Sequence, residues 1–279
     1  MYRLRFCARI FKRSIPLLLC SAFLAFGLAG CRVGEMHESY WKSAKEDVYH
    51  SALQIMNQNE ADLKRGLKWH VILRGNPAIK HLALTFDDGP HPQYTPTLLK
   101  ILEHYHVKAT FFLVGEVAEA HPDLVRAEVA AGHCIANHTY NHVKLTRVPP
   151  EMVATEIKAC GEVLKAITGK APRFFRPPGG DYNDRVLEVA EALGYDTILW
   201  TDDPGDYASP GTKKIESYIF EKISNGGIIL IHDGVPQTID ALPKILDYLQ
   251  DRGFEFITID EMLQEKNKRP PEHEDRPDH

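Results

Sequence analysis

Seven short apolar runs alternate with helical patterns along most of this 279-residue chain. The runs cover residues 81–87, 109–114, 133–137, 173–176, 195–200, 227–232 and 254–258. Apolar strands separated by helices are typical of parallel βα units, in which helices cover the sheet. The part of the chain that contains these runs also has a length that suits a barrel of such units. The expected fold class is therefore α/β, with parallel strands forming a (β/α) barrel.

Two of the intervening segments carry the apolar stripe of a helix that packs on a sheet. Residues 151–167 and 236–249 each place Ile, Leu, Val or Met along one face. Gly169 follows the first of them, at a position where a glycine commonly ends a helix. We interpret both stripes as ordinary core and assign them no function.

The first thirty residues have the pattern of a bacterial signal peptide. Five basic residues precede an apolar stretch at 15–28, which closes with Leu-Ala-Gly before Cys31. This arrangement resembles a lipobox, in which Cys31 is lipidated and becomes the N-terminus. An uncleaved anchor is the alternative, but the stretch is shorter than the roughly 20 residues of a spanning helix. Both interpretations predict an extracytoplasmic domain, and lipidation predicts a membrane-anchored lipoprotein of the cell envelope.

The rest of the chain divides by composition. Residues 31–79 are expected to form a stalk and an N-terminal packing segment, in which the polar stretch 57–60 interrupts any helix. Residues 80–264 contain all the apolar runs and are expected to form the main domain. Residues 265–279 combine prolines with many charges, so a disordered tail is expected there.

The net charge of the chain narrows the classes of binding partner. Removing residues 1–30 takes away five of 33 Lys and Arg but none of 38 Asp and Glu, which leaves a net charge of −10. An acidic protein of this kind is not expected to bind nucleic acid.

Besides Cys31, only Cys134 and Cys160 remain, and buried free thiols are expected, with a disulfide between them as the alternative. The oligomeric state is left open, with a monomer as the working hypothesis.

Two adjacent carboxylates end the first apolar run, in the stretch 84–90, LTFDDGP. Gly89 and Pro90 prevent the strand from continuing, so Asp87 and Asp88 are expected at its carboxyl end, where barrel enzymes keep catalytic groups. Neighbouring carboxylates repel each other, and a bound cation with an arginine partner keeps both ionised. A simple Asp-Gly turn is the common alternative.

Two histidines follow the third run, in the stretch 135–142, IANHTYNH. His138 and His142 are four residues apart, which lets two imidazoles converge on one ion if the segment turns helically. Histidines at that spacing also decorate helix surfaces, so the pair alone is ambiguous. Together with Asp88 it forms a set of two histidines and one carboxylate that suits a catalytic Zn²⁺ or a similar divalent ion.

Three more runs end in charged or titratable residues. The run 173–176 ends in Arg176, and the two prolines that follow cannot continue a central strand. The stretch 200–207 contributes three carboxylates, and the run 227–232 ends in His232. Any one of these could be an ordinary loop. Five such strand ends, however, do not fit a purely structural protein.

In this order, the five stretches resemble the polysaccharide deacetylase family of carbohydrate esterases, also called the chitooligosaccharide deacetylase homology domain. The resemblance covers about residues 80–260, and TFDDGP followed by HTYNH about fifty residues later is highly specific. It implies that residues 80–264 are a catalytic domain with a distorted, incomplete (β/α) barrel. It also implies a metal-dependent hydrolase that removes N-acetyl groups from a polysaccharide.

The resemblance gives the matching residues catalytic roles. Asp87 would be the general base, kept ionised by Arg176. His232 would be the general acid, with Asp206 orienting it and raising its pKa. The implied cofactor is a divalent metal, with Zn²⁺ expected and Co²⁺ as the alternative. Its implied ligands are Asp88, His138 and His142.

The resemblance also implies a substrate groove. Pro178 and Tyr207 would wall it, Leu230 would line a pocket for the acetyl methyl group, and a backbone N–H near Gly179 would hold the oxyanion. Two positions depart from the family pattern, since Gly179 and Tyr207 stand where the family usually has an aromatic residue and a tryptophan. These changes reduce the area that can stack on a sugar ring.

The residues account for the implied chemistry. Hydrolysis of an N-acetyl group needs a nucleophilic water, a stabilised oxyanion and a proton for the departing amine. The expected partners are an N-acetylated envelope glycan, peptidoglycan or chitin-like, and the membrane. Two alternatives stay open. A silent glycan-binding lipoprotein would be expected to lack a ligand, the base or the acid, and none is missing, whereas a de-O-acetylase or small-molecule deacetylase would share every catalytic residue.

Overall fold

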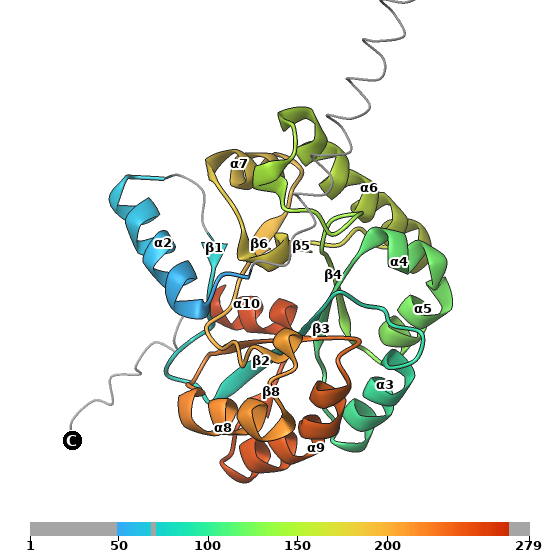
Figure 1. Cartoon of the computed structure of the whole chain (residues 1–279), viewed down its shortest axis with the longest axis vertical. Coiled ribbons are helices and arrows are strands. Elements are labelled where there is room, and N and C mark those ends of the chain that lie inside the picture. Colours follow the sequence, from blue (N-terminus) through green and yellow to red (C-terminus); the bar gives the residue numbers. More distant parts are fainter. Residues whose placement is uncertain (1–48, 68–70, 268–279) are drawn as a thin grey trace, which may run out of the picture. The chain divides into compact units, whose positions relative to one another are not determined.

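The computed structural model describes residues 49–67 and 71–267, and these form a parallel sheet with helices around it (Figure 1). The sheet order is β1-β6-β5-β4-β3-β2-β7, and β8 pairs with β2. Within the described residues the two end strands, β1 and β7, do not pair with each other, so the barrel is incomplete, as expected. The strands are β1 (Val71–Ile72), β2 (His81–Asp87), β3 (Thr110–Leu113), β4 (Cys134–Asn137), β5 (Phe174–Phe175), β6 (Asp196–Ile198), β7 (Ile228–His232) and β8 (Glu255–Phe256).

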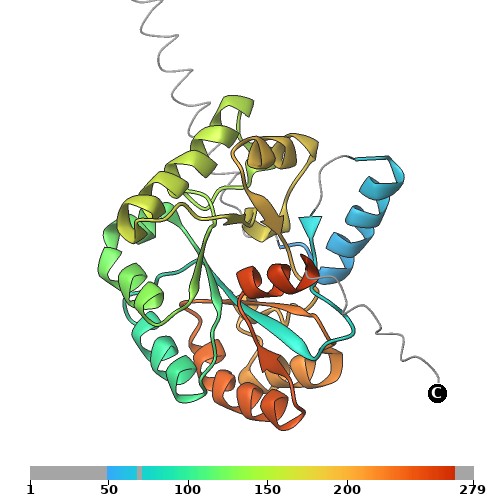
Figure 2. The same cartoon turned by 180° about the vertical axis from the view of Figure 1, so that it is seen from behind.

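Most helices lie outside the strands, whereas α10 lies near the centre of both views of the ribbon (Figures 1 and 2). The predicted helices at 151–167 and 236–249 are α6 and α9, and Gly169 caps α6 with a φ of 76°. Three 3₁₀ turns are η1 (Leu145–Arg147), η2 (Pro178–Gly180) and η3 (Asp206–Ala208). The helices are α2 (Ala52–Lys64), α3 (Thr95–His104), α4 (Gly115–Ala120), α5 (Pro122–Ala130), α6 (Pro150–Thr168), α7 (Asp184–Ala192), α8 (Thr212–Lys222), α9 (Pro236–Asp251) and α10 (Ile259–Asn267).

One apolar core joins the sheet to these helices. β7 is buried at every position, and β2 at every position after its first, as strands covered on both faces must be. Burial of each large apolar side chain contributes about 1.5–3 kcal/mol, which makes this part of the sheet a rigid support. The fully buried members of the core include Leu82, Phe86, Leu98, Leu102, Phe111, Leu164, Leu242 and Leu246.

The N-terminal part of the structure differs from the sequence expectation. α2 runs through residues 57–60, where an interruption was predicted. Ser51 starts the helix with a capping box to Gln54, and Ile55 anchors one face in the core. Asn57 and Glu60 lie on the exposed face, so their polarity does not oppose the helix. The sheet also begins before residue 80, because β1 pairs with β6.

Several other expectations concern the chain ends and the cysteines. α10 continues to Asn267, so the first three residues of the predicted disordered tail are helical. The rest of that tail, the predicted signal peptide and Cys31 lie outside the described residues. In the described part of the chain, no helix has the length and hydropathy of a membrane span. Cys134 and Cys160 are free thiols, Cys160 buried and Cys134 partly exposed. Burial raises their pKa values to about 11 for Cys134 and about 12 for Cys160.

The register of the sheet brings the polar stretches to one edge. Asp87 at the end of β2 pairs with His232 at the end of β7. On the other side of β2, the end of β3 pairs with Asn137 of β4, which in turn pairs with Phe175 of β5. Because parallel strands end at the same edge, the loops after β2, β4, β5 and β7 meet there.

Candidate active site

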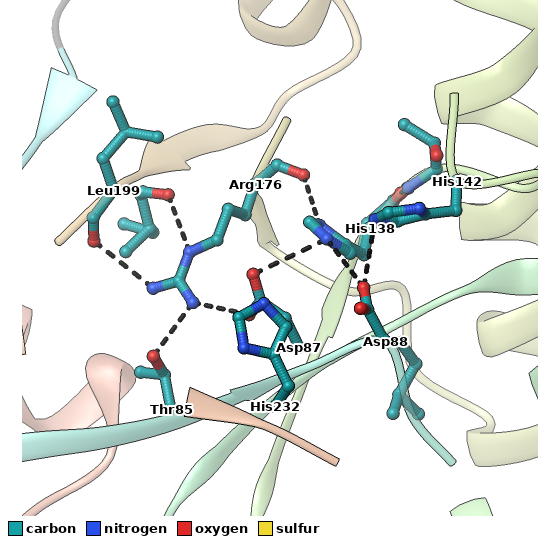
Figure 3. Close-up of polar contacts among 12 residues, drawn as sticks. Thr85, Asp87, Asp88, His138, His142, Arg176, Leu199 and His232 are labelled. Carbon is teal, nitrogen blue, oxygen red and sulfur yellow. Dashed lines mark hydrogen bonds and ion pairs between the residues drawn. The ribbon is translucent and has the colours of Figure 1, made fainter. Parts of the chain in front are cut away.

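Asp87 is held at the end of β2 by Arg176, which follows β5 (Figure 3). Arg176 Nη1 donates to Asp87 Oδ1 at 2.6 Å, and both side chains are buried. The guanidinium also donates to Thr85 Oγ1 at 2.9 Å and to the carbonyls of Ile198 and Leu199 at 3.2 and 3.3 Å. Burial lowers the pKa of Arg176, although the charge of Asp87 opposes this shift. The paired cation offsets the cost of burying the Asp87 carboxylate.

The predicted ligands Asp88, His138 and His142 come together beside this pair. Their donor atoms all lie within 4.8 Å of one another. Asp88 Oδ1 is 3.0 Å from His142 Nε2 and 3.4 Å from His138 Nε2. The second oxygen of Asp87, Oδ2, is 3.5 Å from His138 Nε2 and therefore borders the same cluster. The three residues are a possible metal-binding group of the composition found at catalytic zinc sites.

A second contact fixes the orientation of His138. Its Nδ1 lies 2.8 Å from the carbonyl oxygen of Arg176 and donates to it, since a carbonyl can only accept. The Nε2 lone pair is then directed at Asp88, where a metal ligand needs it. Arg176 therefore supports both halves of the site, with its side chain on Asp87 and its carbonyl on His138 (Figure 3).

The charges of the cluster shift its pKa values. Burial would raise the pKa of Asp88, but His142, His138 and His232 lower it well below its ordinary value of 3.8. Burial would lower the pKa of His142, but Asp88 and Asp87 raise it above 6.5. Each group thus stabilises the charged form of its neighbour.

The backbone is strained at two of the three ligands. Asp88 has a φ of 73° and His142 a φ of 53°, and Thr139 between the histidines has a φ of 66°. Non-glycine residues seldom adopt this left-handed conformation, which clusters at functional sites when the surroundings enforce it. The loop after β4 turns in this way, rather than as the helical turn that the His138–His142 spacing suggested.

Polar side chains that the sequence analysis did not single out support this loop. Asn137 Oδ1 accepts from the backbone N–H of Thr139 at 2.9 Å. The buried Glu156 of α6 accepts from the backbone N–H of Asn141 at 2.9 Å and from its side chain at 2.7 Å. Thr85, noted above, supports Arg176 in the same way. Only a folded structure reveals these partners, because each lies far along the chain or acts through a backbone group.

His232 lies at the end of β7, next to Asp87 of β2, and its side chain is paired with Asp206. Its Nδ1 donates to Asp206 Oδ1 at 2.7 Å, and its backbone N–H donates to Oδ2 at 2.8 Å. Thr238 Oγ1 also donates to Oδ2, at 2.5 Å. Burial would lower the pKa of His232, but Asp206, Asp88 and Asp87 raise it to about 9. The predicted contact between Asp206 and His232 is therefore present in the structure.

The residues expected to form the groove lie at the same edge. Pro178 and Gly179 are buried in η2, directly after β5. Tyr207 is in η3 and 38% exposed. Leu230 is buried on β7, two residues before His232, and therefore on the same side of the strand. Tyr49, which the sequence analysis did not select, stacks on Tyr207 with ring centroids 4.0 Å apart.

A separate cavity of about 460 Å³ opens at the other end of the strands. It borders the starts of β4 and β5 and is lined in part by His133, Cys134, Arg173 and Asp260. None of the residues placed above in the candidate site lines it. The cavity therefore does not belong to the site at the carboxyl edge.

Comparison with known sequences agrees with this geometry. The family described as polysaccharide deacetylase matches residues 74–198. A peptidoglycan-N-acetylglucosamine deacetylase of Bacillus cereus is 40% identical over 193 residues, which span 67% of this chain and 90% of that protein. A chitooligosaccharide deacetylase of a Bradyrhizobium species is 37% identical over 194 residues, 64% of this chain and 89% of the relative.

Solved structures give the same assignment. A peptidoglycan N-acetylglucosamine deacetylase superposes with a TM-score of 0.70 at 34% identity, covering 73% of this chain and 97% of that one. A pseudoenzyme of carbohydrate esterase family 4 from Bacillus anthracis superposes with a TM-score of 0.67 at 29% identity, covering 71% and 70%. The sequence match, the incomplete parallel barrel and the arrangement of the site all agree. The chain therefore belongs to the polysaccharide deacetylase family, carbohydrate esterase family 4.

Proposed function

We propose that this protein is a metal-dependent deacetylase that removes N-acetyl groups from an envelope polysaccharide. One observation carries the proposal: a cluster of two histidines and a carboxylate lies beside a buried carboxylate held by arginine, and a buried histidine held by a carboxylate is paired with that arginine-bound carboxylate across the neighbouring strands. These are Asp88, His138 and His142, with Asp87 on Arg176 and His232 on Asp206. The arrangement offers a base, an acid and a set of metal ligands at one strand edge.

The ligand residues fit a divalent metal. Asp88 Oδ1 and His142 Nε2 are buried and have no hydrogen-bond partner among the described residues, although they lie 3.0 Å apart. Two electron-pair donors at that distance need a shared cation or proton between them. Two nitrogens and one oxygen favour Zn²⁺, with Co²⁺ as the alternative. When bound, such an ion would polarise the acetyl carbonyl and lower the pKa of a water molecule.

The chain's own residues supply the proton transfers. Asp87 Oδ2, free of the arginine, accepts the proton of the attacking water. Arg176 keeps Asp87 ionised before that step. A backbone N–H at Gly179 donates to the oxyanion. His232, whose Nδ1 is bound to Asp206, presents Nε2 to the departing nitrogen and protonates it.

The substrate proposal rests on the relatives. Proteins that match this chain over most of their length are named peptidoglycan-N-acetylglucosamine and chitooligosaccharide deacetylases. We therefore infer an N-acetylated envelope glycan, either peptidoglycan or a chitin-like polymer. A pseudoenzyme with this fold is also known. The intact ligand set, base and acid of the present chain favour activity over silent binding.

The location of the protein is part of the proposal. The basic and apolar segments that precede Cys31 support a lipoprotein that is anchored outside the cytoplasm. A domain held in this way meets envelope polymers rather than cytoplasmic metabolites. Its partners would be the glycan and the membrane, without nucleic acid.

A direct experiment measures acetate release by one purified sample from muropeptides, chitooligosaccharides and acetylated xylan. We expect release from at least one of the two N-acetylated glycans, loss of activity after chelation, and recovery with Zn²⁺ or Co²⁺. Full activity after chelation would exclude the metal mechanism. Release from xylan alone would indicate a de-O-acetylase, and binding without release from any substrate would indicate a silent relative.

A further inference from the structure

Tyr49 lies against the proposed general acid, although it is far from it in the sequence. Its ring stacks on Tyr207 with an interplanar angle of 23°. Both tyrosine rings stand nearly perpendicular to the imidazole of His232, at 86° and 73°, and each centroid is 5.6 Å from that ring. Two stacked tyrosines therefore border one side of His232.

The segment that carries Tyr49 is fixed to the loop after β5. The backbone N–H of His50 donates to the carbonyl of Gly179 at 2.9 Å. Ser51 then caps α2, and the buried Ile55 packs so closely on Gly180 that a Cβ there would meet it at 2.9 Å. Tyr49 thus stands two residues before the cap of a helix that is docked on the site.

The docked helix makes a further contact with the same loop. Gln58 Nε2 donates to the carbonyl of Tyr182 at 3.2 Å, and the Tyr182 hydroxyl donates to Asp62 of α2 at 3.2 Å. Ordering of the helix and loop reduces the entropy that Tyr49 would lose on binding a ligand. The tyrosine is therefore preorganised rather than carried by an isolated arm.

We propose that Tyr49 is a substrate-binding residue, which forms with Tyr207 a paired aromatic wall for the sugar ring that bears the departing nitrogen. This inference rests on the proposed function, because it uses His232 as the acid. The acid must reach the nitrogen, so the sugar that carries this nitrogen lies beside His232. The two tyrosines are the aromatic surface at that place, and aromatic side chains commonly line such sites.

The proposal also explains how the chain deals with two departures from the family pattern. Gly179 and Tyr207 provide less stacking area than the residues usual there. Tyr49 adds a second ring against Tyr207 and is attached, through His50, to Gly179 itself. The N-terminal segment thus supplies aromatic surface that the catalytic loops lack.

The test compares Tyr49→Ala with Tyr49→Phe, which keeps the ring, and with Leu53→Ala, an exposed residue of α2. Each variant is assayed on an N-acetylglucosamine tetramer and on 4-nitrophenyl acetate, which has no sugar ring. We expect Tyr49→Ala to raise KM for the tetramer about two- to tenfold, and to change kcat and both constants for the ester much less. Tyr49→Phe and Leu53→Ala should behave as wild type. Thermal melting of each variant verifies folding.

Other outcomes overturn the proposal. An unchanged KM for the tetramer, or an equal loss on tetramer and ester, would make Tyr49 a structural residue only. A lower KM would make it an obstruction. Calorimetry measures how tightly the tetramer binds to wild type and to Tyr49→Ala. This measurement tests the inference independently of the proposed function. If wild type hydrolyses neither the tetramer nor muropeptides, the proposed function fails. Weaker binding of the tetramer by the variant would still support the wall in that case, and equal binding would refute it.

Discussion

The imidazole and the backbone N–H of His232 are both bound by the carboxylate of Asp206, one through each oxygen. This double contact fixes the ring orientation and the proton on Nδ1. The negative charge of Asp206 also outweighs the effect of burial and raises the pKa of His232 to about 9. The imidazole is therefore protonated at neutral pH, as a general acid must be.

Replacing Asp206 by Asn should move the alkaline limb of the pH profile. The change keeps the shape but removes the charge, so the pKa of His232 falls from about 9 towards its ordinary 6.5. Protonated acid is then lost at lower pH, and the alkaline limb of kcat/KM should shift down by about one to two pH units. Kinetics from pH 5 to 10 measure the shift.

Asp203→Asn is the matched control, because Asp203 is a neighbouring carboxylate that does not bind the His232 ring. We expect it to move the alkaline limb much less than Asp206→Asn does. An alkaline limb that stays in place in folded Asp206→Asn protein would show that His232 is not the acid or that Asp206 does not control it.

Replacing His138 by Ala should remove the metal as well as the activity. His138 provides one of the three proposed donor atoms, and its Nε2 is aligned by the carbonyl of Arg176. Metal content measured by mass spectrometry should fall from about one ion per chain to near zero. The exposed His104 of α3 offers the control His104→Ala, which should keep both metal and turnover. Undiminished metal in His138→Ala would place the ion elsewhere.

Replacing Arg176 by Met should destabilise the fold. It leaves the Asp87 carboxylate buried without its partner, which typically costs about 3–5 kcal/mol. The double variant Asp87→Asn/Arg176→Met removes both charges and should be more stable than the sum of the single effects predicts. Denaturant unfolding of the four proteins measures the coupling. Strict additivity would mean that the two side chains do not stabilise each other.

The burial of Glu128 predicts that the protein loses stability at higher pH. Its carboxyl is fully buried in α5, and neither oxygen has a hydrogen-bond partner among the described residues. Burial and then the charge of Asp233 raise the pKa of Glu128 well above 4.5. The folded state therefore holds the proton more tightly than the unfolded state, and the free energy of unfolding falls as pH rises above about 4.5.

Glu128→Gln removes this titration and should flatten the decline between pH 5 and 8. The slope attributable to one group is at most about 1.4 kcal/mol per pH unit. The exposed Glu188→Gln on α7 should leave the decline unchanged. Urea unfolding at a series of pH values measures the effect, and parallel curves for wild type and Glu128→Gln would contradict the expectation.

Replacing Cys31 by Ser tests the proposed anchor. If Cys31 is lipidated, wild type should partition into the detergent phase and sediment with membranes. The serine variant should be released or remain as an unprocessed precursor of higher mass. Wild-type protein found in the cytoplasmic fraction would reject the lipoprotein proposal.

Local sequence patterns predicted seven strands of the sheet but did not predict its first strand, β1. The seven apolar runs are local signals, and each contains a strand of the structure. β1 has only two residues, too few for a periodic pattern, and exists because it pairs with β6. The break expected at 57–60 was wrong because the Ser51 cap and the burial of Ile55 outweigh weak helix propensity.

The candidate site was likewise predicted in part. The resemblance pointed to Arg176 with Asp87 and to Asp206 with His232, and both contacts are present. Thr85 was not predicted, because its role depends on a hydrogen bond to a residue 91 positions away. Tyr49 belongs to no motif, and only the docking of α2 brings it to the site. Such contacts depend on tertiary structure and leave no local pattern.

The pairing of Asp87 with His232 across β2 and β7 has a consequence for how the enzyme can diversify. Neighbouring strands are about 4.8 Å apart, so the hydrogen-bonded ladder itself sets the separation of the proposed base and acid. Loops that wall the groove, and the segment that carries Tyr49, attach outside this ladder. These loops and this segment are free to change in length and sequence, and thus in the proposed glycan that they accept, while the two proposed proton-transfer groups keep their spacing.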